Sequence, residues 1–349
     1  MPNSVLRHQL SRLVNREDLT RGEAAELLAA MLADDATDAQ IAATLVALSA
    51  KGETAEELTG MAQALRERAV KVSCRHAAFI DTAGTGSSRA KTFNVSTAAA
   101  LVIAGAGLAV AKHGNRAASS KSGSADVLTA LGVNVSALTK ASEDGLNDTG
   151  ICFMFAPLFH GATARVAGIR RELGIRTTFN LLGPLSNPAR APRQVVGVWR
   201  KDLVELLANV LAALGSERAW VVHGEDGLDE ITLDGKTFIA EAQAGVVKAF
   251  EIQPGDFGLA NGDLSHLRGG DAEANAAIIR EVLSGERRDE ARALVVINAA
   301  AALFVGGKAN ELNEAARLAE ASIDTGAAAK KLEDLIEATN HIPSANGAN

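Results

Sequence analysis

Residues 77–97, AAFIDTAGTGSSRAKTFNVST, contain the pattern that decides the fold. A short apolar run at 77–81 predicts a strand, and the glycine-rich loop at 81–88 leads to a helix that begins near Thr97. Glycines let backbone amides approach an anion, and the hydroxyl of Ser96 or Thr97 at a helix N-terminus lies where negative charge is favoured. The stretch therefore predicts a strand, loop and helix that bind phosphate. The alternative is a tight turn in which Ser96 only caps the helix.

The same alternation continues along the chain, where short apolar runs end in glycine-rich loops and are followed by alanine-rich helical segments. This order is typical of a largely parallel sheet covered by helices on both faces. Such sheets bind ligands at the carboxyl ends of their strands. The expected parallel strands are 77–81, 108–111, 151–155, 195–199 and 220–223, an antiparallel pair is expected at 237–241 and 246–252, and the expected helices are 97–105, 124–131, 203–214, 272–283, 288–305 and 312–325.

The first 74 residues have a different, purely helical pattern. Three Thr-x-x-Glu/Gln capping boxes, Thr20/Glu23, Thr37/Gln40 and Thr54/Glu57, each precede an amphipathic run and predict a helical bundle. The expected fold class is α/β, with a small N-terminal helical domain and a large α/β domain whose mostly parallel central sheet is covered by helices. The expected divisions are a helical domain at 1–74, joined by part of about 160–190, an α/β domain at 75–343 and a frayed tail at 344–349.

Composition excludes several classes of protein. The 349 residues contain 35 Lys and Arg against 42 Asp and Glu, and a net charge of −7 disfavours nonspecific attraction to nucleic acid or to an anionic membrane. Aromatic residues make up 3% and tyrosine is absent, which removes the stacking platforms of single-strand nucleic-acid binders. The longest uncharged apolar run, 98–111, is shorter than the roughly 18 residues of a membrane helix. With only Cys74 and Cys152, and with no apolar leader, we expect a cytoplasmic protein with neither nucleic-acid nor membrane partners.

A second strand-end loop, residues 112–124 (KHGNRAASSKSGS), contains three cations and four serines. Hydroxyls and backbone amides can surround one phosphate while Lys112 meets a second one. This loop is therefore predicted to bind phosphate, with a solvated basic surface loop as the alternative. His113 can equally be a structural residue.

Two more segments could bind a ligand at the same edge. Residues 223–230 (HGEDGLDE) place four carboxylates directly after a strand, and hard oxygen donors suit Mg²⁺. An exposed acidic turn is the alternative interpretation. Residues 170–188 combine a basic helix with a turn rich in Gly, Pro and Asn at 183–188, and guanidinium groups there could bind a carboxylate through two hydrogen bonds.

Taken together, these segments resemble the anthranilate phosphoribosyltransferase family over essentially the whole chain. The runs 112–124, 170–188 and 222–230 carry the resemblance, whereas Gly-Thr-Gly at 84–86 is weak alone. The resemblance implies a nucleoside phosphorylase/phosphoribosyltransferase-type fold, with a helical lobe joined by hinges to an α/β domain and a cleft between them. It implies a homodimer formed through the helical lobe. The implied reaction transfers the phosphoribosyl group of 5-phosphoribosyl 1-pyrophosphate to the amino group of anthranilate, in L-tryptophan biosynthesis.

The resemblance also implies roles for individual residues. Two Mg²⁺ ions per active site are expected, one touching Ser96 and Glu230 and the other touching Asp229 and Glu230. Arg170 is expected near the anthranilate carboxylate, and the residues expected to act in catalysis are Lys112, Asn115 and Arg170. The expected substrate-binding residues are Gly84, Ser87, Ser88, Thr92, Asn94, Val95, Ser96, Thr97, Lys112, His113, Gly114, Asn115, Arg116, Ala117, Ala118, Ser119, Ser120, Ser124 and Arg170.

Two segments depart from the pattern of the family. Ser87 and Ser88 stand where Gly-Asp is usual, which removes one carboxylate near the phosphoribosyl site. Residues 160–170 (HGATARVAGIR) replace the usual HPAMKHVAPVR and alter the wall expected around the aromatic substrate. Three alternatives remain at this stage: a phosphoribosyltransferase of the same fold that acts on another aromatic amine, a pyrimidine nucleoside phosphorylase, and a non-catalytic nucleic-acid-binding relative.

Overall fold

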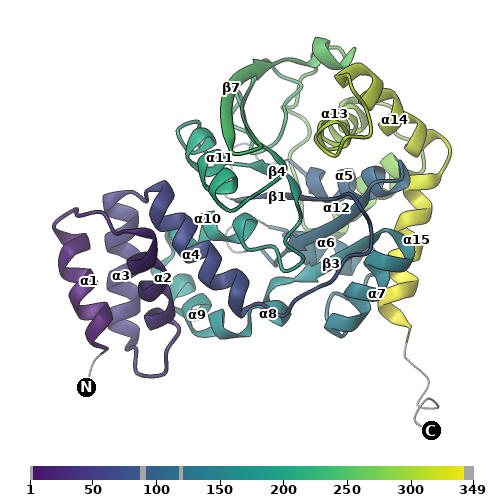
Figure 1. Cartoon of the computed structure of the whole chain (residues 1–349). Coiled ribbons are helices and arrows are strands. Elements are labelled where there is room, and N and C mark those ends of the chain that lie inside the picture. Colours follow the sequence, from purple (N-terminus) through teal and green to yellow (C-terminus); the bar gives the residue numbers. More distant parts are fainter. Residues whose placement is uncertain (1–2, 87–91, 118–120, 342–349) are drawn as a thin grey trace, which may run out of the picture.

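A computed structural model describes residues 3–86, 92–117 and 121–341 of the chain. A bundle of N-terminal helices lies at one end of the molecule, a seven-stranded sheet crosses its middle, and the C-terminal helices lie on the side away from the bundle (Figure 1). The predicted tail at 344–349 falls outside the described residues. The same holds for five of the predicted site residues, Ser87, Ser88, Ala118, Ser119 and Ser120.

The bundle begins with α1 (Ser4–Val14), α2 (Arg21–Met31), α3 (Asp38–Lys51) and α4 (Ala55–Arg68). All three predicted capping boxes are confirmed, because at the start of α2, α3 and α4 the threonine and the Glu or Gln three residues later exchange hydrogen bonds with the backbone. Two later helices, α9 (Ala164–Leu173) and α10 (Thr178–Leu185), pack against α3 and α4. The chain therefore returns to the bundle between its third and fourth strands.

The sheet has the order β3-β2-β1-β4-β5-β6-β7. The strands from β3 to β5 in this order are parallel to one another, whereas β6 pairs antiparallel with both β5 and β7. The predictions of a mostly parallel sheet and of an antiparallel pair at its end are therefore confirmed. The strands are β1 (Phe79–Gly84), β2 (Ala109–Gly114), β3 (Ile151–Phe155), β4 (Arg193–Gly197), β5 (Arg218–Gly224), β6 (Thr237–Gln243) and β7 (Val246–Ile252).

Both faces of the sheet are buried, and alternate residues of each strand serve opposite faces. In β4, Val195 belongs to one hydrophobic cluster and Val196 to another. Ile80 of β1 joins the first of these clusters, whereas Phe79 joins a third that lies over β1 to β3. The cluster around Val196 also contains the leucines of the bundle, so the bundle and this face of the sheet share one core.

Helices cover the two faces. The face of Val195 is covered by α5 (Val95–Gly105), α6 (Ser124–Ala130), α12 (Ala272–Leu283), α13 (Glu290–Val305), α14 (Leu312–Asp324) and α15 (Ala327–Asn340). The opposite face packs against α11 (Leu203–Ala213) and the bundle. The remaining elements are α7 (Thr139–Thr149), α8 (Ala156–Phe159) and the short 3₁₀ turns η1 (Gly161–Thr163) and η2 (Pro254–Phe257).

Several boundaries differ from the sequence-based expectation. β1 and β2 each run three residues beyond the predicted ends at 81 and 111, because ladder hydrogen bonds continue through polar positions that interrupt the apolar pattern. α13 starts two residues later than predicted, since the Asp289 side chain caps it by accepting from the Ala291 N–H. The Gly183-Pro184 pair, expected in a turn, lies inside α10.

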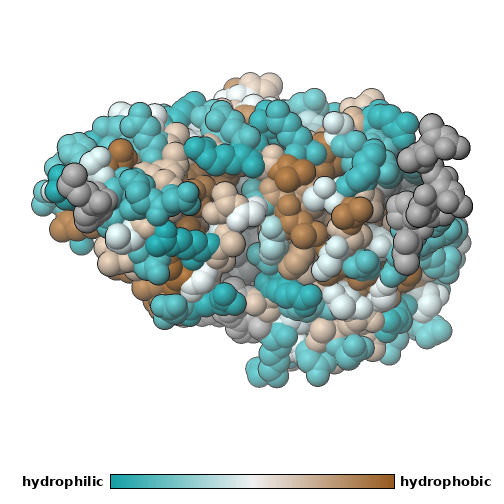
Figure 2. Space-filling view, turned by 90° about the horizontal axis from the view of Figure 1, so that it is seen from below, coloured by the Kyte–Doolittle hydropathy of each residue, from teal (hydrophilic) through white to brown (hydrophobic). Residues whose placement is uncertain are grey.

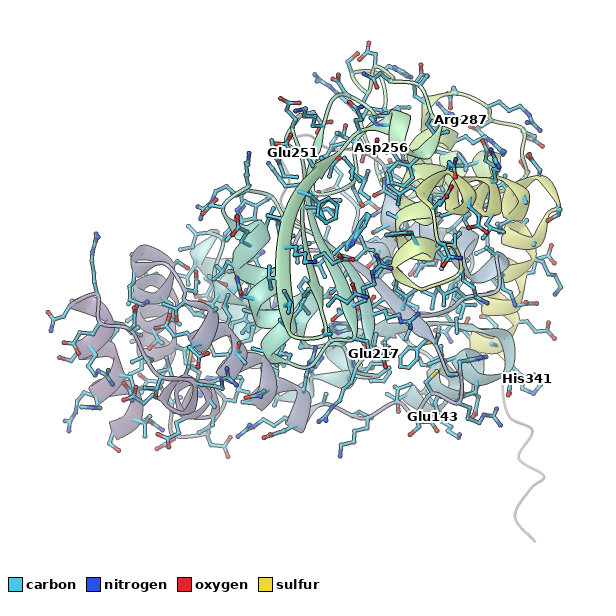
Figure 3. All side chains as sticks on the ribbon, turned by 45° about the horizontal axis from the view of Figure 1, so that its top comes forward. Glu143, Glu217, Glu251, Asp256, Arg287 and His341 are labelled. Atoms are coloured by element: carbon cyan, nitrogen blue, oxygen red, sulfur yellow. The ribbon has the colours of Figure 1, made fainter. Side chains whose placement is uncertain are left out.

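Charged side chains lie mainly on the outside of the molecule, as the labelled Glu217, Glu251 and Asp256 illustrate (Figure 3). Among the described helices, none combines the length and the apolar character that a membrane crossing requires.

Candidate active site

The carboxyl ends of β1 and β4 meet where the chain reverses its direction across the sheet. From β1 the strands proceed to β2 and β3 on one side, and the chain then returns to β4 on the other side of β1. Gly84 at the end of β1 pairs with Gly197 at the end of β4. Open parallel sheets bind their ligands in the crevice at such a switch point, so this edge is the candidate active site.

Two glycines let the acidic loop after β5 lie directly on these strand ends. A Cβ at Gly197 would overlap the backbone carbonyl of Asp229, and a Cβ at Gly84 would lie 3.2 Å from the Asp229 Oδ2 atom. Because neither strand end has a side chain, the loop can bring Asp229 to the switch point. The predicted acidic loop thus reaches the same edge as the loop that follows β1.

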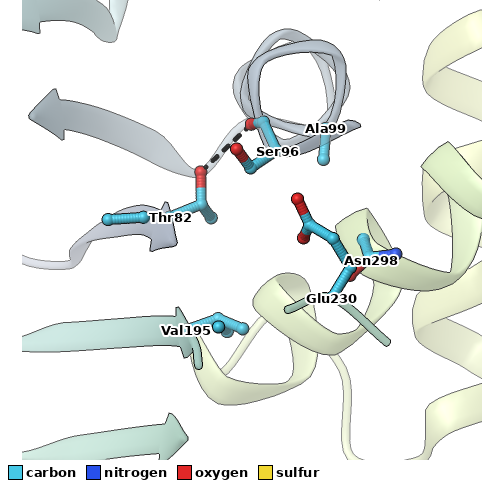
Figure 4. Close-up of a pocket in the computed structure, with 8 residues that line it drawn as sticks. Thr82, Ser96, Ala99, Val195, Glu230 and Asn298 are labelled. Atoms are coloured by element: carbon cyan, nitrogen blue, oxygen red, sulfur yellow. Dashed lines mark hydrogen bonds between the residues drawn. The ribbon is translucent and has the colours of Figure 1, made fainter. Parts of the chain in front are cut away.

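Glu230 points its carboxylate toward the start of α5 (Figure 4). The Ser96 backbone favours the ionised form of this carboxylate, and both residues line a pocket that Thr82 also borders. Burial and the neighbouring Asp229 carboxylate raise the pKa of Glu230 to about 8, against the opposing effect of the Lys112 ammonium. Burial also raises the pKa of Asp229. Two adjacent acids whose ionisation is disfavoured make a site where a cation is favoured.

The donor atoms at this edge suit the predicted metal. Ser96 in the first turn of α5 offers a hydroxyl, and Asp229 and Glu230 offer carboxylates, all of them hard oxygen donors of the kind that Mg²⁺ prefers. The two other acids of the loop have different partners: Asp226 accepts from the Thr232 hydroxyl at 2.7 Å, and Glu225 from the Lys236 N–H at 3.2 Å. Of the four carboxylates, two are therefore available at the switch point.

Asn298 of α13 holds the acidic loop in place, and the sequence analysis did not identify it. Its Oδ1 accepts from the Ile231 N–H and its Nδ2 donates to the Ile231 carbonyl, both at 2.9 Å. Asn298 is buried and lines the same pocket as Glu230, the residue before Ile231. A buried asparagine in an apolar helix was the available signal, but its partner is 67 residues away.

Lys112 lies beneath the pocket and not in an exposed loop. It belongs to β2, and its Nζ donates to the Thr82 carbonyl and, at 3.4 Å, to the Ser96 hydroxyl. Burial lowers the pKa of Lys112, while Asp81 and Glu230 act in the opposite direction. The Asp81 and Glu230 carboxylates thus favour the charged form of Lys112, whose ammonium lies against Ser96 at the start of α5.

Asp126 organises the described part of the 112–124 loop. At the third position of α6, its Oδ2 accepts from the Ala117 and Gly123 N–H groups, both at 2.9 Å. Its Oδ1 accepts from the Arg116 guanidinium at 2.9 Å, and that guanidinium also lies over the Phe155 ring. Arg116, predicted to bind substrate, thus has protein partners. The spacing of Gly123 and Asp126 is that of a capping box and could have identified Asp126 from the sequence.

Among the predicted site residues at 92–97, Asn94 forms polar contacts with the neighbouring loop, whereas the side chains of Val95 and Thr97 lie in the core. Asn94 hydrogen-bonds to Ser122 through both its oxygen and its nitrogen at 3.3 Å, so the first two loops are joined. The side chains of Val95 and Thr97 are buried, at 0% and 1% exposure. These two residues can therefore contact a ligand only through their backbone.

Arg170 and two histidines approach the same face of α10. The Arg170 Nη2 donates to the Asn180 Oδ1 at 3.2 Å, and the His113 Nδ1 donates to the carbonyl of Gly183, three residues further along. The rings of His113 and His160 lie 5.1 Å apart between centroids. Within the described part of the chain, the Arg170 Nε and both histidine Nε2 atoms are buried without a hydrogen-bond partner, which marks this face of α10 as a place for a polar ligand.

The buried histidines predict a loss of stability in acid. Burial, helped by His160, lowers the pKa of His113 to about 3, so between pH 6.5 and 3 the unfolded chain binds a proton that the folded chain does not. The free energy of unfolding should therefore decrease as the pH is lowered, by up to about 1.4 kcal/mol per pH unit from this group alone. His113→Gln should reduce that slope in urea unfolding between pH 6 and 4. Equal slopes for both proteins would contradict the prediction.

Comparisons with known proteins agree with this architecture. A family model described as glycosyl transferase family, a/b domain, matches residues 76–329, and one described as glycosyl transferase family, helical bundle domain, matches residues 7–69. Anthranilate phosphoribosyltransferase of Moorella thermoacetica is 52% identical over 332 residues, covering 95% of this chain and 98% of the relative. The enzyme of that name from Anaeromyxobacter dehalogenans is 50% identical over 335 residues, covering 96% and 99%.

Solved structures give the same result. Anthranilate phosphoribosyltransferase from Thermus thermophilus superimposes with a TM-score of 0.89 at 40% identity, covering 95% of this chain and 99% of that one. The enzyme from Saccharomyces cerevisiae in complex with PRPP and Mg gives 0.88 at 29% identity, covering 97% and 99%. With a glycosyl transferase model over most of its length and relatives about half identical to it, the chain belongs to the anthranilate phosphoribosyltransferase family of enzymes.

Proposed function

We propose that this enzyme transfers the phosphoribosyl group of 5-phosphoribosyl 1-pyrophosphate (PRPP) to the amino nitrogen of anthranilate, with release of pyrophosphate, in a Mg²⁺-dependent step of L-tryptophan biosynthesis. The observation that carries the proposal is the meeting of Asp229, Glu230, Ser96 and Lys112 at one strand edge. The yeast relative has been solved with PRPP and Mg, and also in complex with 4-fluoroanthranilate.

The phosphates of PRPP fit the loops after β1 and β2. Ser96 in the first turn of α5 lines the pocket at this edge, and a helix N-terminus favours negative charge. In this proposal Gly84, Thr92 and Asn94 to Thr97 contact the phosphates together with the loop from Lys112 to Ser124. Val95 and Thr97 contribute their backbone, because their side chains lie in the core.

Ser96, Asp229 and Glu230 would hold Mg²⁺, with two ions per site as the expectation. When bound, the metal supplies positive charge that neutralises the diphosphate as the bond to the sugar breaks. Lys112 adds a fixed charge beneath the same pocket. Asn298 keeps the acidic loop against α5.

Anthranilate would bind on the α10 side of the site. Its carboxylate suits the Arg170 guanidinium, whose Nε has no hydrogen-bond partner among the described residues. Gly84 and Asn115 would face the ring and its amine. The open wall at 160–170, where a Cβ on Gly161 or Gly168 would meet nothing within 4 Å, supports testing other aromatic amines too.

Catalysis in this proposal rests on orientation and charge. An aryl amine is neutral at pH 7, so no base is needed to prepare it, and His113 with a pKa of about 3 is a poor base. Holding two reactants in the right geometry can contribute on the order of 7–11 kcal/mol, which exceeds what a single general base supplies. Lys112, Asn115 and Arg170 are the proposed catalytic residues because each would touch a reactant.

Replacing Arg170 should affect the two substrates differently. Arg170→Ala is expected to raise the KM for anthranilate by about 10- to 100-fold, since a charge-assisted hydrogen bond to a carboxylate contributes roughly 1.5–3 kcal/mol. The KM for PRPP should change by less than about 3-fold. Steady-state kinetics with each substrate varied measures both values, and Arg171→Ala, an exposed neighbour on α9, is the matched control. Equal losses for both substrates would remove the proposed role.

The overall reaction has a direct test. Anthranilate fluorescence should disappear when enzyme and PRPP are mixed in the presence of Mg²⁺, and it should persist when the metal is chelated. A panel of other aromatic amines run in parallel decides whether anthranilate is the preferred acceptor. No consumption of anthranilate under any of these conditions would overturn the proposed function.

The assembly and setting of the enzyme form a separate part of the proposal. A homodimer through the helical lobe is supported by exposed apolar side chains on α1 and α3, Val14 at 69% and Val46 at 41% exposure. Apolar groups lie among hydrophilic ones over this end of the molecule (Figure 2). Light scattering of the enzyme as it elutes from a size-exclusion column should give twice the chain mass of 36.1 kDa. The domain division at 74–75 and the cytoplasmic setting also stay predictions.

A further inference from the structure

Asp81 is a carboxylate in the interior of the sheet, and the proposed reaction gives it no contact with a substrate or a metal ion. It lies on β1 between β2 and β4, with 0% of its surface exposed. Burial raises its pKa to about 6, so it is still ionised at neutral pH. Burying a charge is costly, and apolar residues of similar volume are often as good or better for stability. A buried carboxylate beside an active site therefore points to a purpose other than stability.

The donors to Asp81 come from two separate segments. Its Oδ1 accepts from the His113 N–H at 3.2 Å, and its Oδ2 accepts from the Asn187 Nδ2 at 2.7 Å. Asn187, also at 0% exposure, donates from the same nitrogen to the Ala111 carbonyl at 2.9 Å, and its Oδ1 accepts from the Ala189 N–H. The side chain of Asn187 is thus fixed from three directions, with β1 and β2 on one side and its own turn on the other.

This cluster joins the two halves of the proposed site. His113 is the second-to-last residue of β2, the strand that leads into the proposed phosphate-binding loop, whereas Asn187 is the second residue after α10, the helix whose Asn180 accepts from Arg170. The His113 ring adds a second link between the same halves, by donating to the Gly183 carbonyl at 3.2 Å. Gln194 of β4 supports the α10 end by donating to the Pro184 carbonyl at 2.9 Å.

We propose that Asp81, through its hydrogen bonds to Asn187 and to the His113 backbone, is a positioning residue that fixes the Arg170 half of the site relative to the phosphate half. The distance between the amine and the sugar carbon depends on that relation, because each substrate is held by a different half. Asp81 touches neither substrate, so its effect appears in the step that needs both. This inference rests on the proposed function.

The test separates binding from reaction. Asp81→Asn keeps the size of the side chain and can leave an oxygen for the His113 N–H, but it turns an NH₂ group toward the Asn187 NH₂ group. We expect the single-turnover rate at saturating PRPP, Mg²⁺ and anthranilate to fall by about 10- to 100-fold, as expected when reacting groups are misplaced. The dissociation constants of Mg²⁺·PRPP and of anthranilate, each measured alone by calorimetry, should change by less than about 3-fold.

Asn187→Ala removes the same link from the other end and keeps the test decisive if Asp81→Asn folds poorly. It should show the same split between rate and binding. The double variant should lose little more than the more affected single variant, because both remove one link. Thr339→Val, which deletes a buried hydroxyl at the end of α15, is the control for a purely structural loss and should keep the single-turnover rate.

The outcomes are distinguishable. Single-turnover rates within about 3-fold of the unmodified enzyme for both single variants would overturn the inference. A loss of rate that is explained by weaker binding of one substrate would also overturn it. So would a loss in the double variant equal to the sum of the two single losses in activation free energy. An unmodified enzyme that uses another aromatic amine but not anthranilate overturns the proposed substrate, and Asp81 is then tested with that amine. An enzyme that consumes no amine with PRPP overturns both proposals.

Discussion

The paired substitution Asp229→Asn and Glu230→Gln is expected to lower Mg²⁺-dependent turnover by about 10³-fold, a larger loss than any single substitution should cause. Both carboxylates lie at the switch point of the sheet, and Glu230 lines one pocket with Ser96 at the start of α5. Amides keep the shape and remove both charges. A bound metal ion contributes several kcal/mol to stabilising a charged leaving group, and roughly 4 kcal/mol corresponds to this loss.

Initial rates over a range of Mg²⁺ concentrations measure the effect. The variant should require far more Mg²⁺ and should not reach the unmodified rate at saturation, while circular dichroism and anthranilate binding stay unchanged. Glu225→Gln is the matched control, because Glu225 is an exposed acid of the same loop whose carboxylate accepts from the Lys236 N–H. An unchanged response to Mg²⁺ in the paired variant would reject the metal assignment.

Lys112→Met should give the second largest effect, a loss of about 10²- to 10³-fold in kcat/KM for PRPP. The Lys112 ammonium is buried at the Thr82 carbonyl and the Ser96 hydroxyl, where a charge acts more strongly than in water. Removing it also takes away the positive charge that lowers the pKa of both Asp81 and Glu230, so the pKa of each carboxyl should rise and both should take up protons more readily.

Steady-state kinetics with PRPP varied gives the loss, and the pH dependence of the rate reports the proton uptake. Activity of the variant should recover partly at higher pH, where Glu230 ionises again. Lys140→Met removes an exposed lysine of α7 that pairs with Asp144 and should leave the kinetics unchanged. If Lys112→Met keeps normal kcat/KM for PRPP, the buried charge has no part in the reaction.

The sequence predicted those parts of the fold that depend on local signals. The capping boxes of α2, α3 and α4 are complete within four residues each, so they could be read directly. The parallel strands follow from apolar runs before glycine-rich loops. The sequence could not reveal α10, because its Gly183-Pro184 pair is typical of a turn. The helix forms in spite of this pair because it is stabilised by packing against α3 and α4.

The candidate site was predictable to the extent that its residues stand at strand ends. Ser96, Lys112, Asp229 and Glu230 were found in this way, and they share one edge of the sheet. Asp81, Asn187 and Asn298 matter for the geometry but were missed as participants. Asp81 and Asn187 are 106 residues apart, and Asn298 lies 67 residues from its partner. No local spacing encodes such pairs, which only the folded sheet and its helices bring together.

The core shared by the bundle and the sheet limits how far the two lobes can part. Leu58 and Leu65 of α4 belong to the same hydrophobic cluster as Leu207 and Leu211 of α11, and burying one leucine contributes roughly 1.5–3 kcal/mol. A wide separation of the bundle from the sheet would expose many such side chains to water at once. Relative motion of the bundle and the sheet is therefore confined to small rotations that keep these leucines buried.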